Sequence, residues 1–217
     1  MADTPPAVLA FFHDIVAGRE AEFEEWFQHE HLPERIAIPG FVMGRRYEAV
    51  SADRSYFHFY AIRSVEDLKS DAYIARVNEP TPLTRTVMTE ITKNVFRTVC
   101  RRIYQRGVMR GAAAVTVRLA DRAIEAELGT MIEELVRDRA VACGEIWQGV
   151  DPVEFSVSAE ERLRGGDRKL DTCLLVETLR IADAERIALA LANDFHAANI
   201  GVYRFLCQIG ASQHPSR

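Results

Sequence analysis

The segment WFQHEHLPERIAIPGFVMGRRY, residues 26–47, carries two histidines, His29 and His31, that stand two residues apart. Imidazole titrates near neutral pH and also binds metals, so the pair could serve acid–base chemistry or a metal site. Residues two apart on a helix point about 200° away from each other, whereas helical metal pairs are spaced four apart. No cysteine lies nearby to complete a ligand set. We therefore expect a pocket here and no metal.

His31 continues the apolar stripe that Phe23 and Phe27 begin, so its imidazole is expected to face the protein interior. Pro33 disfavours helical geometry at Leu32 and predicts that the helix ends there. His31 would then lie at a helix C-terminus, where the helix dipole favours its protonated form and burial opposes it. A core histidine bonded to the backbone is the open alternative.

The strand predicted at residues 56–62 divides its rings between two faces. One face carries Tyr56, His58 and Tyr60, and the other carries Phe57, Phe59 and Ala61. We expect the phenylalanine face to lie under helices, which places the face with His58 inside a barrel between two sheets. Burying such polar groups costs free energy unless a hydrogen bond or a ligand uses them. His13, on the first strand, is a further candidate, although it could equally face outward at an edge.

Charged candidates accompany these rings. Arg46 and Tyr47 point to opposite faces of one strand, and Arg46 could orient an anionic or enolate oxygen. The favoured interpretation of Arg46 is a structural ion pair with Glu34. Glu34 itself could act as a base if burial raises its pKa, and otherwise it is an exposed residue.

An internal repeat indicates which elements position these residues. Residues 95–100 read VFRTVC and residues 202–207 read VYRFLC, and the order of predicted elements is the same in both halves. The first half predicts strands at 8–16, 41–50, 56–62 and 95–103, with helices at 19–31, after Ser64 and after Pro82. The second half predicts strands at 113–119, 140–150, 170–179 and 200–210, with helices at 121–138 and 183–199. The helix at 121–138 carries an apolar stripe of Ile124, Leu128, Met131, Ile132, Leu135 and Val136, and the polar loop 158–169 is expected to be mobile.

Each half therefore reads β-α-β-β-α-β, the ferredoxin-like unit. A sheet covered by helices on one face leaves its other face apolar and open, and the second sheet of the same chain can cover it. We predict an α+β fold in which repeats 1–106 and 112–217 pair their sheets into an intrachain pseudo-dimeric barrel, joined by residues 105–111. Arg97 and Arg204 occupy equivalent positions, which favours a symmetric structural role such as pairing across the barrel.

Residues 26–47 resemble the W-x(4)-H-[LI]-P-E-x(3)-x-P-G-[FV]-x(3)-R-[YF] pattern of EthD-like proteins, a branch of the dimeric α+β barrel superfamily. The matching residues are Trp26, His31, Leu32, Pro33, Glu34, Pro39, Gly40, Phe41, Arg46 and Tyr47. The resemblance implies a small-molecule pocket between sheet and helices. Relatives include monooxygenases that act without a metal, muconolactone isomerase, polyketide cyclases and heme proteins, so the fold does not define the reaction. The second half lacks an H-L-P-E run, which implies a pocket in the first repeat only.

The composition limits the classes of binding partner that we expect for the protein. A net charge of −5 argues against nucleic acid and anionic membranes, and 48% apolar residues predict a substantial core. The N-terminal residues have no basic leader, so a cytoplasmic protein is expected. The four cysteines lack C-x-x-C spacing and are expected to be reduced thiols. Exposed strand edges would allow two chains to associate as a homodimer.

Three functions compete. The first is an enzyme that needs no cofactor, since the sequence has neither a Rossmann glycine fingerprint nor a P-loop. Its substrate would be small and apolar, aromatic or polyketide-like, and its reaction an isomerisation, cyclisation, dehydration or oxygenation. Catalysis is assigned to His31, His58, Tyr60 and Glu34, and substrate binding to Trp26, Tyr56, Arg46 and His13. The second function is non-catalytic ligand binding, as in an accessory protein of a degradation pathway. The third, implied by the resemblance to tandem heme-binding barrels, is heme ligation by His196.

Overall fold

The computed structural model describes residues 5–120, 125–196 and 198–211, and in them a single antiparallel barrel closes in the order β1-β3-β2-β8-β5-β7-β6-β4. Its strands are β1 (Ala7–Ile15), β2 (Phe41–Ser51), β3 (Tyr56–Ile62), β4 (Thr92–Arg106), β5 (Ala113–Leu119), β6 (Val141–Gly149), β7 (Thr172–Thr178) and β8 (Asn199–Gly210). The predicted α+β class and the closed barrel are therefore confirmed.

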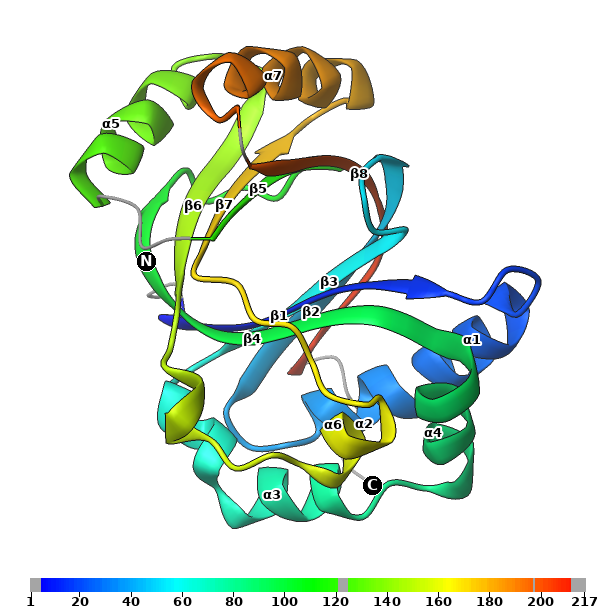
Figure 1. Ribbon diagram of the computed structural model, residues 1–217. Helices are drawn as coiled ribbons and strands as arrows, with labels where there is room; N and C mark the ends of the chain where they lie inside the picture. The colour runs from blue at the N-terminus through cyan, green and yellow to red at the C-terminus, as the bar shows by residue number, and fades with distance from the viewer. Residues whose placement is uncertain (1–4, 121–124, 197, 212–217) are drawn as a thin grey trace.

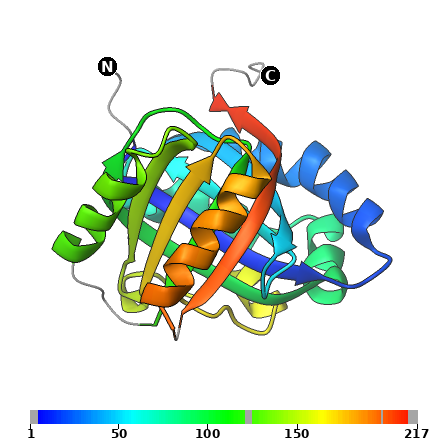
Figure 2. The same cartoon turned by 90° about the horizontal axis from the view of Figure 1, so that it is seen from above.

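Helices cover the outside of the barrel in two groups (Figure 1). Beside β1–β4 lie α1 (Glu20–Trp26), the π-helix η1 (Phe27–His31), α2 (Leu32–Ile36), the 3-10 helix η2 (Val65–Lys69), α3 (Asp71–Asn78), α4 (Pro82–Thr86), the π-helix η3 (Val87–Ile91) and α6 (Ala159–Leu163). Helices α5 (Glu125–Leu135) and α7 (Ile181–Asp194) lie across β5–β8, as the view from above shows (Figure 2). A short 3-10 helix, η4 (Pro152–Glu154), follows β6.

Local sequence accounts for most of these elements. Ser64 and Asp67 form a capping box at the start of η2, where a helix is predicted after Ser64. Helix α7 buries Ala184, Ile187 and Leu191 at helical spacing, which seats it on its sheet. Helix α5 is described from Glu125, so the predicted helical start at 121–124, including Ile124, lies outside the described residues.

The barrel interior is aromatic, and this reverses the faces predicted for β3. Phe57 and Phe59 point into the barrel, where they pack with Tyr47, Trp147 and Tyr203. The opposite face of β3, with Tyr56, His58 and Tyr60, lies under the first group of helices. Strands β6 and β8 contribute Trp147 and Tyr203 to this interior, and the phenylalanine face of β3 packs against these rings. The expectation that His58 faces the inter-sheet interior is therefore wrong.

The helix that carries His31 does not end before Pro33. Leu32 has helical φ and ψ angles of −65° and −46°, and α2 runs on to Ile36. The reason lies in the π-turn of η1, where the backbone N–H of Leu32 donates to the carbonyl of Phe27, five residues earlier. Pro33 directly follows this wider turn. The regular α-helical pattern of backbone hydrogen bonds is already interrupted there, so the helix tolerates the missing N–H and the ring of proline.

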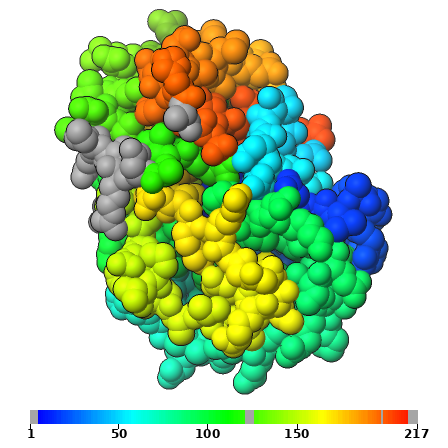
Figure 3. Space-filling model, in the orientation of Figure 1, coloured from blue at the N-terminus to red at the C-terminus, as the bar shows by residue number. Residues whose placement is uncertain are grey.

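The segment between β6 and β7, residues 150–171, crosses from the second sheet to the first group of helices, and Figure 3 shows it lying over them. The segment predicted as a polar loop at 158–169 contains a helix, α6 (Ala159–Leu163). Arg168 bonds β4 through both backbone groups, since its N–H donates to the Val95 carbonyl at 2.9 Å and its carbonyl accepts from the Arg97 N–H at 3.0 Å. Helix α6 buries Glu160 and Glu161. These tertiary contacts hold a polar segment in place.

The described residues contain free cysteines only, with Cys100, Cys143 and Cys173 buried and Cys207 partly buried. Within residues 5–120, 125–196 and 198–211, we find no helix whose length and hydropathy would let it cross a membrane.

Candidate functional site

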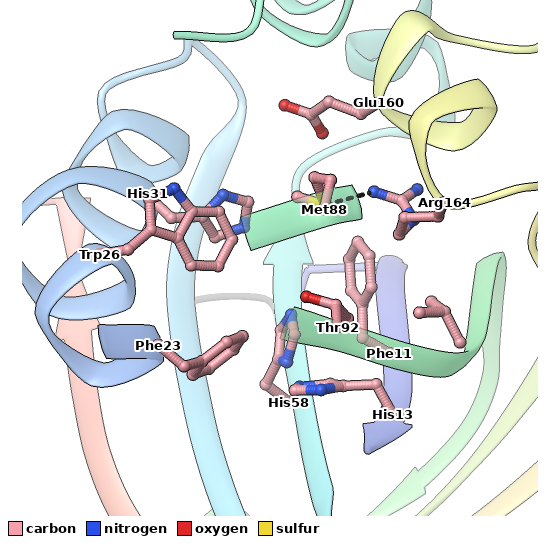
Figure 4. Close-up of a pocket in the computed structure, with 11 residues that line it drawn as sticks. Phe11, His13, Phe23, Trp26, His31, His58, Met88, Thr92, Glu160 and Arg164 are labelled. Carbon is pink, nitrogen blue, oxygen red and sulfur yellow. Dashed lines mark hydrogen bonds between the residues drawn. The ribbon is translucent and has the colours of Figure 1, made fainter. Parts of the chain in front are cut away.

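A cavity lies between β1, β3 and β4 on one side and α1, η1, η3 and α6 on the other (Figure 4). It is lined by Phe11, His13, Phe23, Trp26, His31, His58, Met88, Thr92, Val95, Glu160 and Arg164. The empty space at its centre is about 20 Å³. That volume holds about one water molecule, so a larger ligand requires the wall to move.

Three histidines from three different elements face this cavity. His13 and His58 come from neighbouring strands, with ring centroids 5.3 Å apart. His31 comes from η1, and its ring lies 4.3 Å from Trp26 and 5.6 Å from Phe27. Phe27 in turn contacts His58 at 5.1 Å. Candidates that the sequence spreads over 46 positions are therefore brought together by the fold.

Burial keeps these imidazoles neutral. It lowers the pKa of His13 to about 3, with a smaller contribution from the positive charge of Arg46. Burial also holds the pKa of His31 well below its ordinary value, helped by Arg35. The pKa of His58 is lowered in the same way, by burial first and then by His13. The expectation that a helix dipole would favour protonated His31 is wrong, because the helix continues past it.

Several polar atoms at the cavity have no hydrogen-bond partner among the described residues. They are Nε2 of His13, Nδ1 and Nε2 of His58, and Oγ1 of Thr92. Unpaired buried polar groups are costly, on the order of 1–3 kcal/mol each. Such a concentration of unpaired atoms in one place is a common mark of a functional site.

Trp26 is fixed in the cavity wall by a hydrogen bond. Its indole N–H donates to the hydroxyl of Thr84 on α4 at 2.9 Å, and that hydroxyl donates to Glu30 at 2.8 Å. The bond ties α1 to α4 and holds the indole against His31. Trp26 thus lies where the sequence placed it, in the pocket.

Arg46 lies beside His58 but behind the cavity wall. The two residues pair directly across β2 and β3, and the guanidinium lies about 5 Å from the rings of Phe23, Phe27 and Tyr56. Its carboxylate neighbour is Glu24 at 3.7 Å, so the predicted pairing with Glu34 is wrong. Tyr47 lies on the opposite face, as predicted.

Glu34 is not brought to the cavity. Its carboxylate pairs with Arg76 at 3.0 Å, and burial raises its pKa. Tyr56 and Tyr60 flank the cavity without lining it. The hydroxyl of Tyr60 is buried and has no partner among the described residues, and burial raises its pKa. Tyr60 is therefore a neutral donor near the site.

Two polar residues that line the cavity were not predicted from the sequence. Glu160 lies on α6 and Arg164 directly follows this helix, in the segment predicted as a loop. Arg164 donates to the sulfur of Met88 at 3.0 Å and pairs with Asp167, as seen in Figure 4 for Met88. Phe11 could have been found, because it shares a strand face with His13 two residues later.

Other predicted roles are not supported. Arg97 donates to the hydroxyl of Tyr73, whereas Arg204 is exposed and pairs with Glu48, so the two arginines have no common role. His196 is exposed after α7 and lines none of the described cavities, which does not fit an axial ligand of a buried heme. His29 is exposed and pairs with Glu25 at 3.1 Å. No metal-binding group of three or more His, Cys, Asp or Glu residues occurs in the described part of the chain.

Comparisons with known proteins show the fold alone. No family model and no curated protein matches the chain. Among solved structures, an anthrone oxidase-like protein matches with a TM-score of 0.66 at 13% identity, over 99% of this chain and 97% of its own. A proposed monooxygenase from Fusobacterium nucleatum matches with a TM-score of 0.56 at 10% identity, over 97% and 96%. A proposed chlorite dismutase matches with a TM-score of 0.53 at 11% identity, over 94% and 96%.

Proposed function

We propose that this chain is an enzyme of the EthD-like type that moves a proton on a small aromatic or polyketide-like substrate without a cofactor. Its two ferredoxin-like repeats, 1–106 and 112–217, would form the barrel within one chain, and the first would supply the site. The observation that carries the proposal is the set of neutral, buried imidazoles with unpaired nitrogens in an aromatic cavity. A neutral imidazole carries a lone pair that can accept a proton when an anion forms beside it and offsets the cost of the buried positive charge, and its surroundings suit a flat apolar ring.

His58 is the proposed base, because both of its ring nitrogens are unpaired. It would take a proton from an acidic C–H or O–H of the substrate and become an imidazolium. The positive charge of Arg46, paired with His58 across the strands, would stabilise the enolate or phenolate that forms. The imidazolium of His58 would then return this proton to a second position of the substrate, either directly or through His31 on the facing helix, which would accept the proton, pass it on and end neutral again. Trp26 and His13 would hold the substrate ring, and Tyr60 would serve as a neutral donor.

Substrate entry must open the cavity. The space of about 20 Å³ is bounded on one side by Met88, by Glu160 of α6 and by Arg164. Moving α6 outward would break the Glu160–Arg35 ion pair and enlarge the cavity without disturbing the strands that carry His13 and His58. We therefore assign α6 as the part of the cavity wall that moves when the substrate binds.

The test uses anthrone, chosen because of the anthrone oxidase-like neighbour and because its methylene protons are acidic. Deuterium incorporation at that methylene is followed by NMR in D₂O under nitrogen, so that oxidation does not interfere. We expect the wild-type protein to accelerate the exchange, and His58→Asn or His31→Asn to lower the rate by about 100-fold or more.

His29→Asn is the matched control, because His29 is exposed and lies two residues from His31. It should leave the exchange rate unchanged. If anthrone binds and its exchange is no faster than in buffer, the chain is a binding protein and the catalytic proposal is wrong. Oxygen consumption, measured afterwards in air, separates an oxygenase from an isomerase or cyclase.

A further inference from the structure

A row of four side chains crosses the first half of the barrel on the face that carries the cavity. In strand register, Arg46 pairs with His58, His58 pairs with Phe11, and Phe11 pairs with Arg97. Neighbouring strands lie about 4.8 Å apart, so Arg97 starts about 10 Å from His58, two strands away.

Phe11 connects the two ends of this row. Its ring stacks on His58 with centroids 4.5 Å apart and an interplanar angle of 13°. The guanidinium carbon of Arg97 lies 5.9 Å from the centroid of the same ring. A flat ligand that lies along Phe11 would thus have a base near one end and a cation near the other.

Arg97 lacks a carboxylate partner. Its side chain donates to the hydroxyl of Tyr73, and no ion pair within 4 Å joins it to a carboxylate among the described residues. The carboxylates of Asp167 and Glu161 act on its charge from farther away. The neighbouring lysines are compensated, since Lys69 pairs with Glu154 at 3.2 Å and Lys169 pairs with Glu161 at 2.9 Å. Arg97 is therefore available to an anion from outside the chain.

Open space reaches Arg97 from two sides. Clefts of about 80 Å³ and about 280 Å³ are both lined by Arg97, Phe155 and Ser156. Their walls come from α3 and β4 and from residues 150–169, the same segment whose helix α6 closes the histidine cavity. One outward movement of this segment would join the clefts with the cavity. The walls also include Leu68, Ile74 and Val77, which suit an apolar ligand body.

We infer that Arg97 binds the carboxylate of the substrate, which is therefore an aromatic acid whose ring lies along Phe11 with its reacting end at His58. This inference rests on the proposed function and names the substrate class of that site. A carboxylate accepts charge-assisted hydrogen bonds from a guanidinium, and the aromatic body packs against Phe11 and Trp26.

The test compares two probes of similar shape by isothermal titration calorimetry at pH 7. 2-Naphthoate carries a carboxylate, and 2-naphthol is a phenol that stays neutral at this pH. We expect the wild-type protein to bind 2-naphthoate more tightly by about tenfold or more, the effect of one charged hydrogen-bonding partner. Arg97→Gln should abolish this preference while leaving 2-naphthol affinity unchanged, and Arg97→Lys should retain part of it. Arg204→Gln removes an exposed arginine from the corresponding strand of the other half and should have no effect.

The failures can be told apart. The anion subsite is wrong if the two probes bind the wild-type protein equally, or if Arg97→Gln keeps the preference for 2-naphthoate. The histidine pocket is nevertheless supported if His31→Asn weakens the binding of both probes. If neither probe binds the wild-type protein, the pocket and the subsite are both wrong. The wild-type comparison decides the charge preference even if an Arg97 variant does not fold.

Discussion

Arg35 on α2 and Glu160 on α6 form a buried ion pair that joins residues 125 positions apart in the sequence. It fastens the segment between β6 and β7 onto the helices that carry His31. The pair therefore links the closure of the cavity to the stability of the folded chain.

We predict that Glu160→Gln destabilises the protein by about 3 kcal/mol, because it leaves the Arg35 charge buried without its partner. Urea unfolding followed by circular dichroism measures this free energy. The double variant Arg35→Met/Glu160→Met should recover most of the loss, since apolar side chains of similar volume need no partner. An unchanged midpoint in the single variant would show that the pair is open in solution.

Stability should fall in acid because of the histidine cluster. The folded pKa of His13 is about 3 and its unfolded pKa is 6.5, so the unfolded state binds more protons between these values. The contribution of neutral His13 to the free energy of unfolding is fully present above pH 6.5. It is lost as the pH falls toward 3, at about 1.4 kcal/mol per pH unit. His31 and His58 act in the same direction. Urea unfolding at a series of pH values should give a shallower slope for His13→Gln than for the wild-type protein.

The pH dependence of anthrone exchange tests the same neutral imidazoles in a different way. A base of ordinary pKa would lose most of its activity between pH 7 and pH 5. Because the pKa of His58 is lowered well below 6.5 by burial, the exchange rate should stay nearly constant over this range. NMR measurement at fixed temperature checks it, and a tenfold fall by pH 5 would contradict a buried neutral base.

The Thr84 hydroxyl does not line the cavity, and we expect it to affect the site through its hydrogen bond to Trp26. Thr84→Val removes the acceptor of the indole N–H and the donor to Glu30. We expect a loss of about 1–3 kcal/mol in the free energy of unfolding and a shift in tryptophan emission, because the buried indole is left unpaired. Thr86→Val, at a half-buried position on the same helix, is the control. It removes only a solvent-exposed bond to the Pro82 carbonyl and should change neither quantity.

The periodicity of apolar residues in the sequence was sufficient to predict much of this architecture. Helical spacing predicted that His31 faces inward, and strand alternation predicted that Arg46 and Tyr47 separate onto two faces. The capping box at Ser64 and the closed α+β barrel were also predictable. These features depend on neighbours a few residues away, whose spacing is written directly in the chain.

Contacts between distant segments decided the rest. Alternation groups Tyr56, His58 and Tyr60 on one face of β3, but only the packing of the second sheet against Phe57 and Phe59 decides which face meets the helices. The closure of the cavity by α6 depends on Glu160 meeting Arg35, a pairing that no local pattern encodes. The sequence by itself determined which side chains share a face, and the tertiary structure determined what each face meets, because burial is a property of the assembled layers.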